Sequence, residues 1–211
     1  MLLQPPIGSA IVSFLIIILL CLPIHEFGHA WAAVKLGDML PIQQGRLTLN
    51  PLRHIDWLGA ALLALAGFGW AKPVQFNPYA LRKAPNPRAG IFVVASAGPV
   101  MNVLLAVAAA VLFRLAWGAL HVSFVTQVLY SLIVINLVLA VFNLIPVPPL
   151  DGSKILAMLL PMQYDNVMAT LNQYGIFILI FLVFPLFNGQ SIVSLVVMPI
   201  VSAATRLLTG L

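Results

Sequence analysis

The residues best suited to chemistry lie close together near the N-terminus, in the sequence His25-Glu26-Phe27-Gly28-His29. In a helix, residues four apart lie on one face, one turn from each other. That separation lets the imidazoles of His25 and His29 bind one tetrahedral zinc ion. Glu26, the only glutamate of the chain, can reach the water that the zinc activates and act as its general base. The pattern therefore predicts a hydrolytic zinc site.

The surroundings of this motif favour the zinc site over a purely structural role. A single buried histidine is usually a satisfied core residue, and the same pattern arises by chance in soluble helices. Here the motif lies in a long apolar run, residues 7–36. Ionisable residues inside a membrane segment are costly and are functional by default.

A catalytic zinc needs a third protein ligand and one open position. The chain has no downstream glutamate, and Ala32 and Lys35 stand where the longer pattern HExxHxxGxxH needs glycine and histidine. The candidates that remain are Asp151, His54, His121, Asp56 and Asp165.

Asp151 is the candidate that its surroundings favour most. It follows three prolines within residues 146–149, which remove amide donors and bar a regular helix. Gly152, which has no side chain, then gives the backbone conformational freedom directly after the aspartate. Irregular backbone at membrane depth is tolerated only when it is buried in protein or lines a wet cavity. We expect this segment to aim one carboxylate inward; the alternative is a simple N-cap of a helix that begins near Ser153.

The composition places these residues in a membrane. Hydrophobic residues make up 62% of the 211 residues, charged residues only 7%, and the mean hydropathy is +1.09, whereas soluble domains carry about 25% charged residues. We expect one multi-pass membrane domain over residues 1–211 in contact with the lipid bilayer. The net charge of +5 does not indicate nucleic acid, because the basic residues are scattered between apolar runs. With Cys21 as the single cysteine, a disulfide within the chain and a multi-cysteine zinc site are excluded.

The apolar runs predict an all-α membrane protein, a polytopic helical bundle of about five to six transmembrane or re-entrant segments. The first run, 7–36, lacks the positive start of a signal peptide and is expected to stay as a helix. The run 57–70 is short for a span of roughly 20 residues and is interpreted as re-entrant. Alternating residues at 46–50 and 72–76 predict a small β-hairpin. The other predicted segments are helices at about 89–118 and 124–144, a helix to about 160, and C-terminal membrane segments within 172–208, at 172–187 and 191–208, with a turn at 187–190.

The basic residues predict an orientation. Seven of the ten lysines and arginines fall between Lys35 and Arg88. If the run 57–70 is re-entrant, all seven lie on one side, which the positive-inside rule assigns to the cytoplasm. We then expect a cell-membrane protein whose active site faces the cytoplasmic side. A full span at 57–70 would divide these residues between two sides and weaken the prediction.

Several motifs together resemble the site-2 protease family of intramembrane zinc metalloproteases, in its short bacterial type without a PDZ domain. His25-Glu26-Phe27-Gly28-His29 is similar to its HExxH helix, and the stretch from Asn143 to Gly152 looks like its second motif. Residues 97–102, Ala-Gly-Pro-Val-Met-Asn, resemble its AGPxxN element, and residues 45–51 and 68–74 look like the short bacterial members. The resemblance covers the core motifs within 11–160, and the rest matches only as membrane segments.

The resemblance implies regulated intramembrane proteolysis with one zinc ion, and it implies Asp151 as the third ligand. The substrates would be single-pass membrane proteins or signal-peptide remnants, whose transmembrane helix must partly unwind before cleavage. Which substrate is cut and which oligomer forms do not follow from the sequence.

Three further residues are expected to contact substrate or to support the site. Asn102 could bind substrate backbone, steady the catalytic water or join two helices. Asn143 could hold the proline-rich turn or contact substrate, and His54 could support a ligand or gate access. Residues 46–50 and 74–76 could also offer a sheet edge to an extended substrate, or form a purely structural hairpin.

Two other functions use the same residues. A zinc transporter or sensor could share these ligands, although transporters usually have repeat-related broken helices and several intramembrane carboxylates. The sequence has no internal repeat, and Glu26 has no evident task in a transporter. A catalytically silent scaffold is the third alternative, against which the intact motif argues.

Overall fold

The computed structural model describes residues 7–66, 69–120, 124–185 and 189–211. The candidate ligand His121 and part of the predicted turn at 187–190 lie outside these ranges. Within them, five helices are long and apolar enough to cross a membrane: Ile11–Leu36, Pro87–Gly118, Phe124–Asn143, Asp165–Val183 and Ile192–Thr209. The prediction of a polytopic helical membrane protein is confirmed.

The first span is one continuous helix in three parts: α1 (Ile7–Ile16), the π-helical turn η1 (Ile17–Cys21) and α2 (Leu22–Leu36). Pro23 has no N–H group and cannot bond the preceding turn. The N–H of Leu22 instead bonds the carbonyl of Ile17, which gives the wider turn of η1. The π-turn therefore lies just before α2, next to the proline. The helix stops at Gly37, whose φ of 111° suits glycine.

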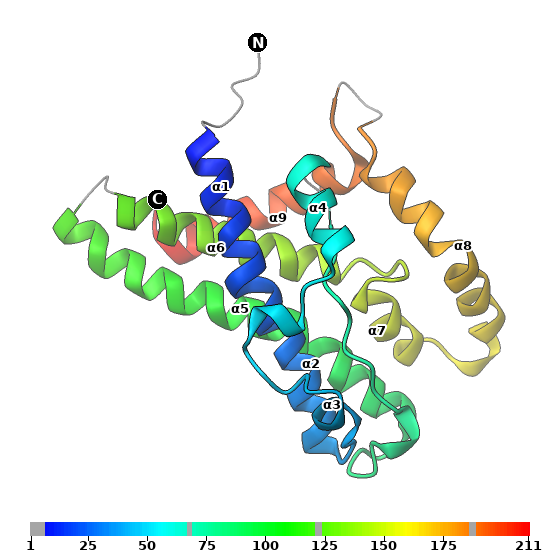
Figure 1. Cartoon of the computed structure of the whole chain (residues 1–211). Helices are drawn as coiled ribbons and strands as arrows, with labels where there is room; N and C mark the ends of the chain where they lie inside the picture. The colour runs from blue at the N-terminus through cyan, green and yellow to red at the C-terminus, as the bar shows by residue number, and fades with distance from the viewer. Residues whose placement is uncertain (1–6, 67–68, 121–123, 186–188) are drawn as a thin grey trace.

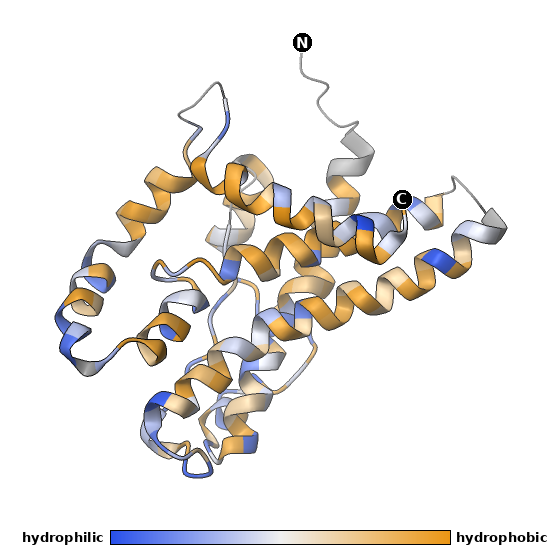
Figure 2. Cartoon of the chain, turned by 180° about the vertical axis from the view of Figure 1, so that it is seen from behind, coloured by the Kyte–Doolittle hydropathy of each residue, from blue (hydrophilic) through white to orange (hydrophobic). Residues whose placement is uncertain are grey.

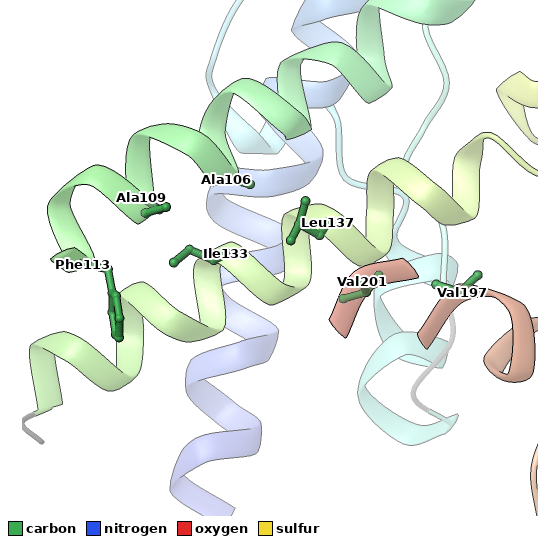
Figure 3. Packing of buried hydrophobic residues seen from close by; sticks show 8 residues of the cluster. Ala106, Ala109, Phe113, Ile133, Leu137, Val197 and Val201 are labelled. Atoms are coloured by element: carbon green, nitrogen blue, oxygen red, sulfur yellow. The ribbon is translucent and has the colours of Figure 1, made fainter. Parts of the chain in front are cut away.

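Three helices form the main apolar core, α5 (Pro87–Leu120), α6 (Phe124–Asn143) and α9 (Ile192–Thr209). Small residues on α5 let the neighbouring helix approach closely, as is typical in membranes. Figure 3 shows side chains of α5 and α9 on either side of α6. The buried members of this core include Ala106, Ala109, Phe113, Ile133, Leu137, Val197 and Val201.

The segment from 57 to 70 turns back on itself. It contains α4 (Trp57–Ala66), which at ten residues is only about 15 Å long. An isolated antiparallel bridge joins Ile55 to Ala71, so the two ends of the segment lie side by side. The returning arm packs tightly on the helix, since a Cβ on Gly59 would lie 2.2 Å from the carbonyl oxygen of Trp70. This geometry agrees with a re-entrant segment and not with a span.

The predicted β-hairpin between 46–50 and 72–76 is wrong. The described residues contain no strand, and in this region an isolated bridge between Ile55 and Ala71 replaces the expected ladder. The guanidinium of Arg46 donates to the carbonyls of Arg53 and Lys72. The carbonyl of Lys72 therefore bonds a side chain, its N–H bonds the carbonyl of His54, and Pro73 offers no N–H for pairing with 46–50.

The remaining elements are short connectors and one peripheral helix (Figure 1). The C-terminal segment predicted from 172 begins earlier, at Asp165, because the polar first turn is helical as well. Figure 2 shows that the long helices are mostly hydrophobic, while hydrophilic residues gather in the connecting segments. The short connectors are α3 (Leu40–Gln43), η2 (Pro51–Arg53), η3 (Pro78–Ala80), α7 (Asp151–Leu159) and η4 (Met162–Tyr164), and the peripheral helix is α8 (Asp165–Val183).

Candidate metal centre

The histidine motif lies on α2 where this helix packs against α5. His25, Glu26 and His29 are all buried, and the four-residue spacing puts both imidazoles on one face. The two helices touch closely at their glycines. A Cβ on Gly28 would lie 2.8 Å from the carbonyl oxygen of Ala97 on α5, so only glycine permits this approach.

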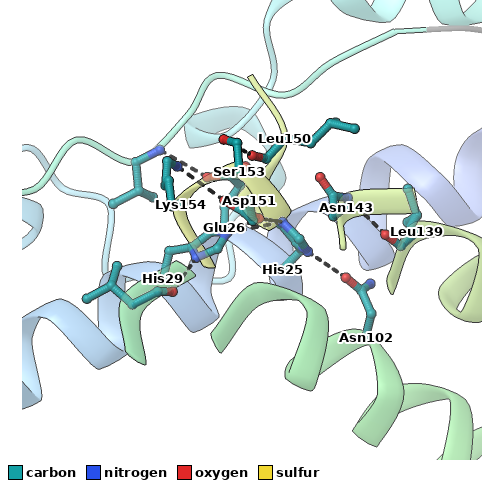
Figure 4. Close-up of polar contacts among 12 residues, drawn as sticks. His25, Glu26, His29, Asn102, Leu139, Asn143, Leu150, Asp151, Ser153 and Lys154 are labelled. Carbon is teal, nitrogen blue, oxygen red and sulfur yellow. Dashed lines mark hydrogen bonds and ion pairs between the residues drawn. The ribbon is translucent and has the colours of Figure 1, made fainter. Parts of the chain in front are cut away.

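Three side chains converge on one point, although Asp151 is remote in sequence from the histidines (Figure 4). The Nε2 atoms of His25 and His29 are 3.1 Å apart. Oδ2 of Asp151 lies 3.3 Å from Nε2 of His25 and 3.1 Å from Nε2 of His29. Ligands about 2.0 Å from a tetrahedral zinc lie roughly 3.3 Å from each other. The donor set of two imidazoles and one carboxylate therefore fits a zinc ion with a fourth position left open.

The outer nitrogens of both imidazoles are held by α5. Nδ1 of His25 lies 2.6 Å from Oδ1 of Asn102, and Nδ1 of His29 donates to the carbonyl of Val94 over 2.7 Å. With a proton on each Nδ1, both Nε2 atoms present a lone pair inward. Gly98 lies on the same stretch of α5, and a Cβ there would be 2.4 Å from Nε2 of His29. Because Gly98 has only a hydrogen in place of a side chain, the rings of His25 and His29 fit beside it.

Asp151 is the first residue of α7 and is buried. Gly152 lets the helix start against the preceding loop, since a Cβ there would lie 2.2 Å from the carbonyl oxygen of Leu144. Nζ of Lys154 binds the outer oxygen, Oδ1, at 3.2 Å. Burial acts to raise the pKa of the Asp151 carboxyl, but the polar side chains of His25 and His29 beside it and the charge of Lys154 outweigh the effect of burial and hold the pKa well below its usual range. The carboxyl is therefore ionised, as a metal ligand must be.

A cavity of about 460 Å³ opens onto the three converging side chains. Its apolar walls come from α6, α8 and the segment after α4, and include Leu139, Phe142, Ile176, Leu179, Val74 and Phe76. Glu26 also faces the cavity, and its Oε2 accepts a hydrogen bond of 3.0 Å from the backbone N–H of Val74. The extended segment 72–76 therefore passes directly beside the glutamate.

The other candidate ligands lie elsewhere among the described residues. His54 is buried, and its Nε2 bonds the carbonyl of Thr48. The carboxylate of Asp56 caps α4 through the N–H of Gly59, and Asp165 pairs with Arg88. In the part of the chain that the structure describes, the grouping of three metal-binding side chains is His25, His29 and Asp151.

The two asparagines differ in position. Asn143 lines the cavity, where its Nδ2 bonds the carbonyl of Leu139. Asn102 is fully buried between helices and bonds a histidine, so it is not placed to contact substrate. Sequence reasoning did not single out Lys154 or Asn136. A lysine one turn after Asp151, and an amide within an apolar span, were the available signals.

Comparison with known proteins shows the family of the chain. A family model described as Peptidase family M50 matches residues 113–184. The chain is 39% identical over 185 residues to a Bacillus subtilis (strain 168) protein named "Putative zinc metalloprotease YwhC", an alignment that covers 85% of this chain and 81% of that protein.

Two mycobacterial proteins are also similar, both named "Putative zinc metalloprotease Rip2". The identity is 31% over 169 residues for the one from Mycolicibacterium smegmatis (strain ATCC 700084 / mc(2)155), covering 78% of this chain and 63% of Rip2. It is 31% over 178 residues for the one from Mycobacterium tuberculosis (strain ATCC 25618 / H37Rv), covering 81% of this chain and 66% of Rip2. The chain thus spans about two thirds of Rip2 or slightly less. No solved structure matches the chain.

The extent of the match to YwhC and the apolar helices lead to one assignment. The chain belongs to peptidase family M50, the site-2 proteases, and is a multi-pass intramembrane zinc metalloprotease that acts on membrane proteins.

Proposed function

We propose that His25, His29 and Asp151 hold the zinc ion and that Glu26 is the general base of peptide-bond hydrolysis. The observation that carries this proposal is the convergence of both Nε2 atoms and Oδ2 of Asp151 within 3.1 to 3.3 Å of one another. When bound, the zinc supplies Lewis-acid activation of water and of the scissile carbonyl.

Glu26 performs the proton transfers. Its Oε2 is held by the N–H of Val74, which fixes the carboxylate plane and leaves Oε1 for the attacking water. Oε1 takes a proton from that water as it attacks the carbonyl carbon, and returns the proton to the leaving amine. The buried position of Glu26, with the apolar cavity walls, limits competing water and strengthens these interactions.

The substrates follow from the cavity and the segment beside it. We infer single-pass membrane proteins or signal-peptide remnants, cut within or near the transmembrane segment. The apolar walls suit such a chain. Residues 72–76 are extended and have no strand partner among the described residues. An unwound substrate could lie in the cavity against Val74 and Phe76 and bring its scissile peptide bond to Glu26.

We also infer that residues 1–211 form one domain in the cell membrane and that its active site opens to the cytoplasmic side. Seven of the ten lysines and arginines lie in the stretch from Lys35 to Arg88. The bridge between Ile55 and Ala71 supports placing both ends of the α4 segment on the same side. The positive-inside rule then assigns that side to the cytoplasm.

A Glu26→Gln variant tests the proposed base. The amide keeps the shape and the bond from Val74 but accepts no proton, so we expect bound zinc at wild-type stoichiometry with cleavage slowed by about 10²-fold or more. Zinc is measured on protein purified in detergent, and cleavage on a transmembrane test substrate with and without a chelator. Cleavage by the variant at the wild-type rate would refute the assignment. Zinc flux through proteoliposomes without cleavage would favour the transporter alternative, which neither the family nor the fold supports.

A further inference from the structure

A chain of buried amides connects His25 to a backbone carbonyl on a third helix. We propose that Asn136, acting through Asn102, fixes the tautomer of His25 in which Nε2 is free to bind metal. Asn136 would then be a positioning residue of the zinc site. This inference rests on the proposed function, in which His25 is a zinc ligand.

The contacts run without interruption across the membrane interior. Nδ2 of Asn136 on α6 donates to the carbonyl of Leu132 at 2.8 Å and to Sγ of Cys21 at 3.2 Å. Nδ2 of Asn102 on α5 donates to Oδ1 of Asn136 at 2.7 Å. Oδ1 of Asn102 lies 2.6 Å from Nδ1 of His25 on α2.

The direction of every bond follows from the carbonyl at the far end. The oxygen of Leu132 only accepts, so Asn136 must turn its NH₂ group toward it and its oxygen toward Asn102. Asn102 must then donate to that oxygen with its own NH₂ group and turn its oxygen toward His25. Nδ1 of His25 must therefore carry the proton, and Nε2 keeps its lone pair.

Burial makes this order rigid. Asn102 and Asn136 are both 0% exposed. An amide in the membrane interior that turned against these partners would leave donors facing donors, which is costly where no water can compensate. Asn136 also lies within an apolar stretch of α6, where a polar side chain is costly unless it has a role.

The tautomer of each of the two imidazoles is set by a different kind of hydrogen-bond partner. His29 bonds the carbonyl of Val94 directly, so its tautomer needs no relay. His25 faces a side-chain amide, which could present either oxygen or nitrogen if nothing fixed it. Without Asn136, Asn102 could turn over, place its NH₂ group at Nδ1 and shift the proton of His25 to Nε2. That proton would point at Asp151 and block metal binding.

The test compares Asn136→Leu, Asn136→Asp and Thr209→Val. Leucine removes the relay, whereas aspartate in either protonation state still offers an oxygen to Asn102. Thr209 is a buried polar residue on α9, and its hydroxyl bonds the carbonyl of Thr205 away from the site. The measurements are zinc affinity by chelator competition and ¹⁵N NMR of labelled histidines in zinc-free protein, with His25→Ala used for assignment.

We expect zinc-free wild type, Asn136→Asp and Thr209→Val to show His25 protonated at Nδ1. Asn136→Leu should gain the tautomer protonated at Nε2 and bind zinc about 10-fold to 100-fold more weakly. The inference is overturned if wild-type His25 carries its proton on Nε2, a result that does not depend on how Asn136→Leu folds. It is also overturned if Asn136→Leu keeps both the wild-type tautomer and affinity.

The same experiment separates this inference from the proposed function. If His25→Ala binds zinc as tightly as the wild type, the ligand assignment itself fails. If His25→Ala loses zinc while Asn136→Leu behaves like Thr209→Val, the ligand assignment stands and the relay alone fails.

Discussion

At the scale of single residues, the site is defined by side chains that limit one another's freedom. Asp151 has one oxygen on Lys154, which leaves the other for the two imidazoles. Each imidazole is held at Nδ1 by α5. Such outer contacts orient the ligands before a metal binds and raise the affinity of the site for the metal.

Gly98 is the residue whose side chain must be absent. In a Gly98→Ala variant the Cβ would lie 2.4 Å from Nε2 of His29 and 2.7 Å from Cε1 of His25, so both rings must move. We expect zinc affinity to fall by about 10-fold or more, with cleavage lost in parallel. Isothermal titration with zinc checks this on protein in detergent.

Gly118→Ala is the matched control, because it makes the same change in the same helix. A Cβ there would meet nothing within 4 Å. Alanine also favours helix over glycine by about 1 kcal/mol. The control should therefore bind zinc and cleave like the wild type, and equal losses in both variants would show that the glycine at 98 has no special role.

The residues of the zinc cluster were predictable from sequence to different degrees. His25, Glu26 and His29 follow from helical spacing alone. Asp151 needed the argument from prolines and membrane depth. Asn136 could not be placed, because the face that it occupies depends on how α5 and α6 rotate against each other.

At the scale of elements, the site depends on segments that do not cross the membrane. The arm after α4 brings Val74 to Glu26, and the loop before α7 brings Asp151 to the histidines. The short apolar run at 57–70 was predictable as re-entrant because it is too short to span. The expected hairpin failed because alternation does not reveal that Arg46 reaches the carbonyls that a strand would need.

Cysteine labelling tests whether α4 is re-entrant. Leu49 and Tyr79 flank the segment and are 56% and 84% exposed, whereas the native Cys21 is fully buried. We expect Leu49→Cys and Tyr79→Cys both to react with an impermeant maleimide from the cytoplasmic side, in inside-out vesicles. Phe124→Cys, at the start of α6, should react from the opposite side, because α5 crosses between them. Reaction of residues 49 and 79 from opposite sides would show that α4 spans.

At the scale of the whole molecule, the described part of the chain combines five apolar helices with a small polar centre where α2, α5 and α7 meet. In the 18-residue apolar window of each candidate span, between 17% and 33% of the residues are buried within the chain. The fold class was therefore predictable from hydropathy alone. Hydropathy does not reveal how α2, α5 and α7 pack against one another to bring Asp151 beside the first span.

The third ligand tests that arrangement most directly, because Asp151 joins the centre only if the whole fold is right. Zinc X-ray absorption is measured on purified Asp151→Cys, with Asp56→Cys as control; the native Cys21 bonds Asn136 away from the cluster. We predict a zinc–sulfur distance of about 2.3 Å in Asp151→Cys alone. Zinc bound by Asp151→Cys at full stoichiometry without sulfur, or sulfur at the zinc of Asp56→Cys, would contradict the assignment.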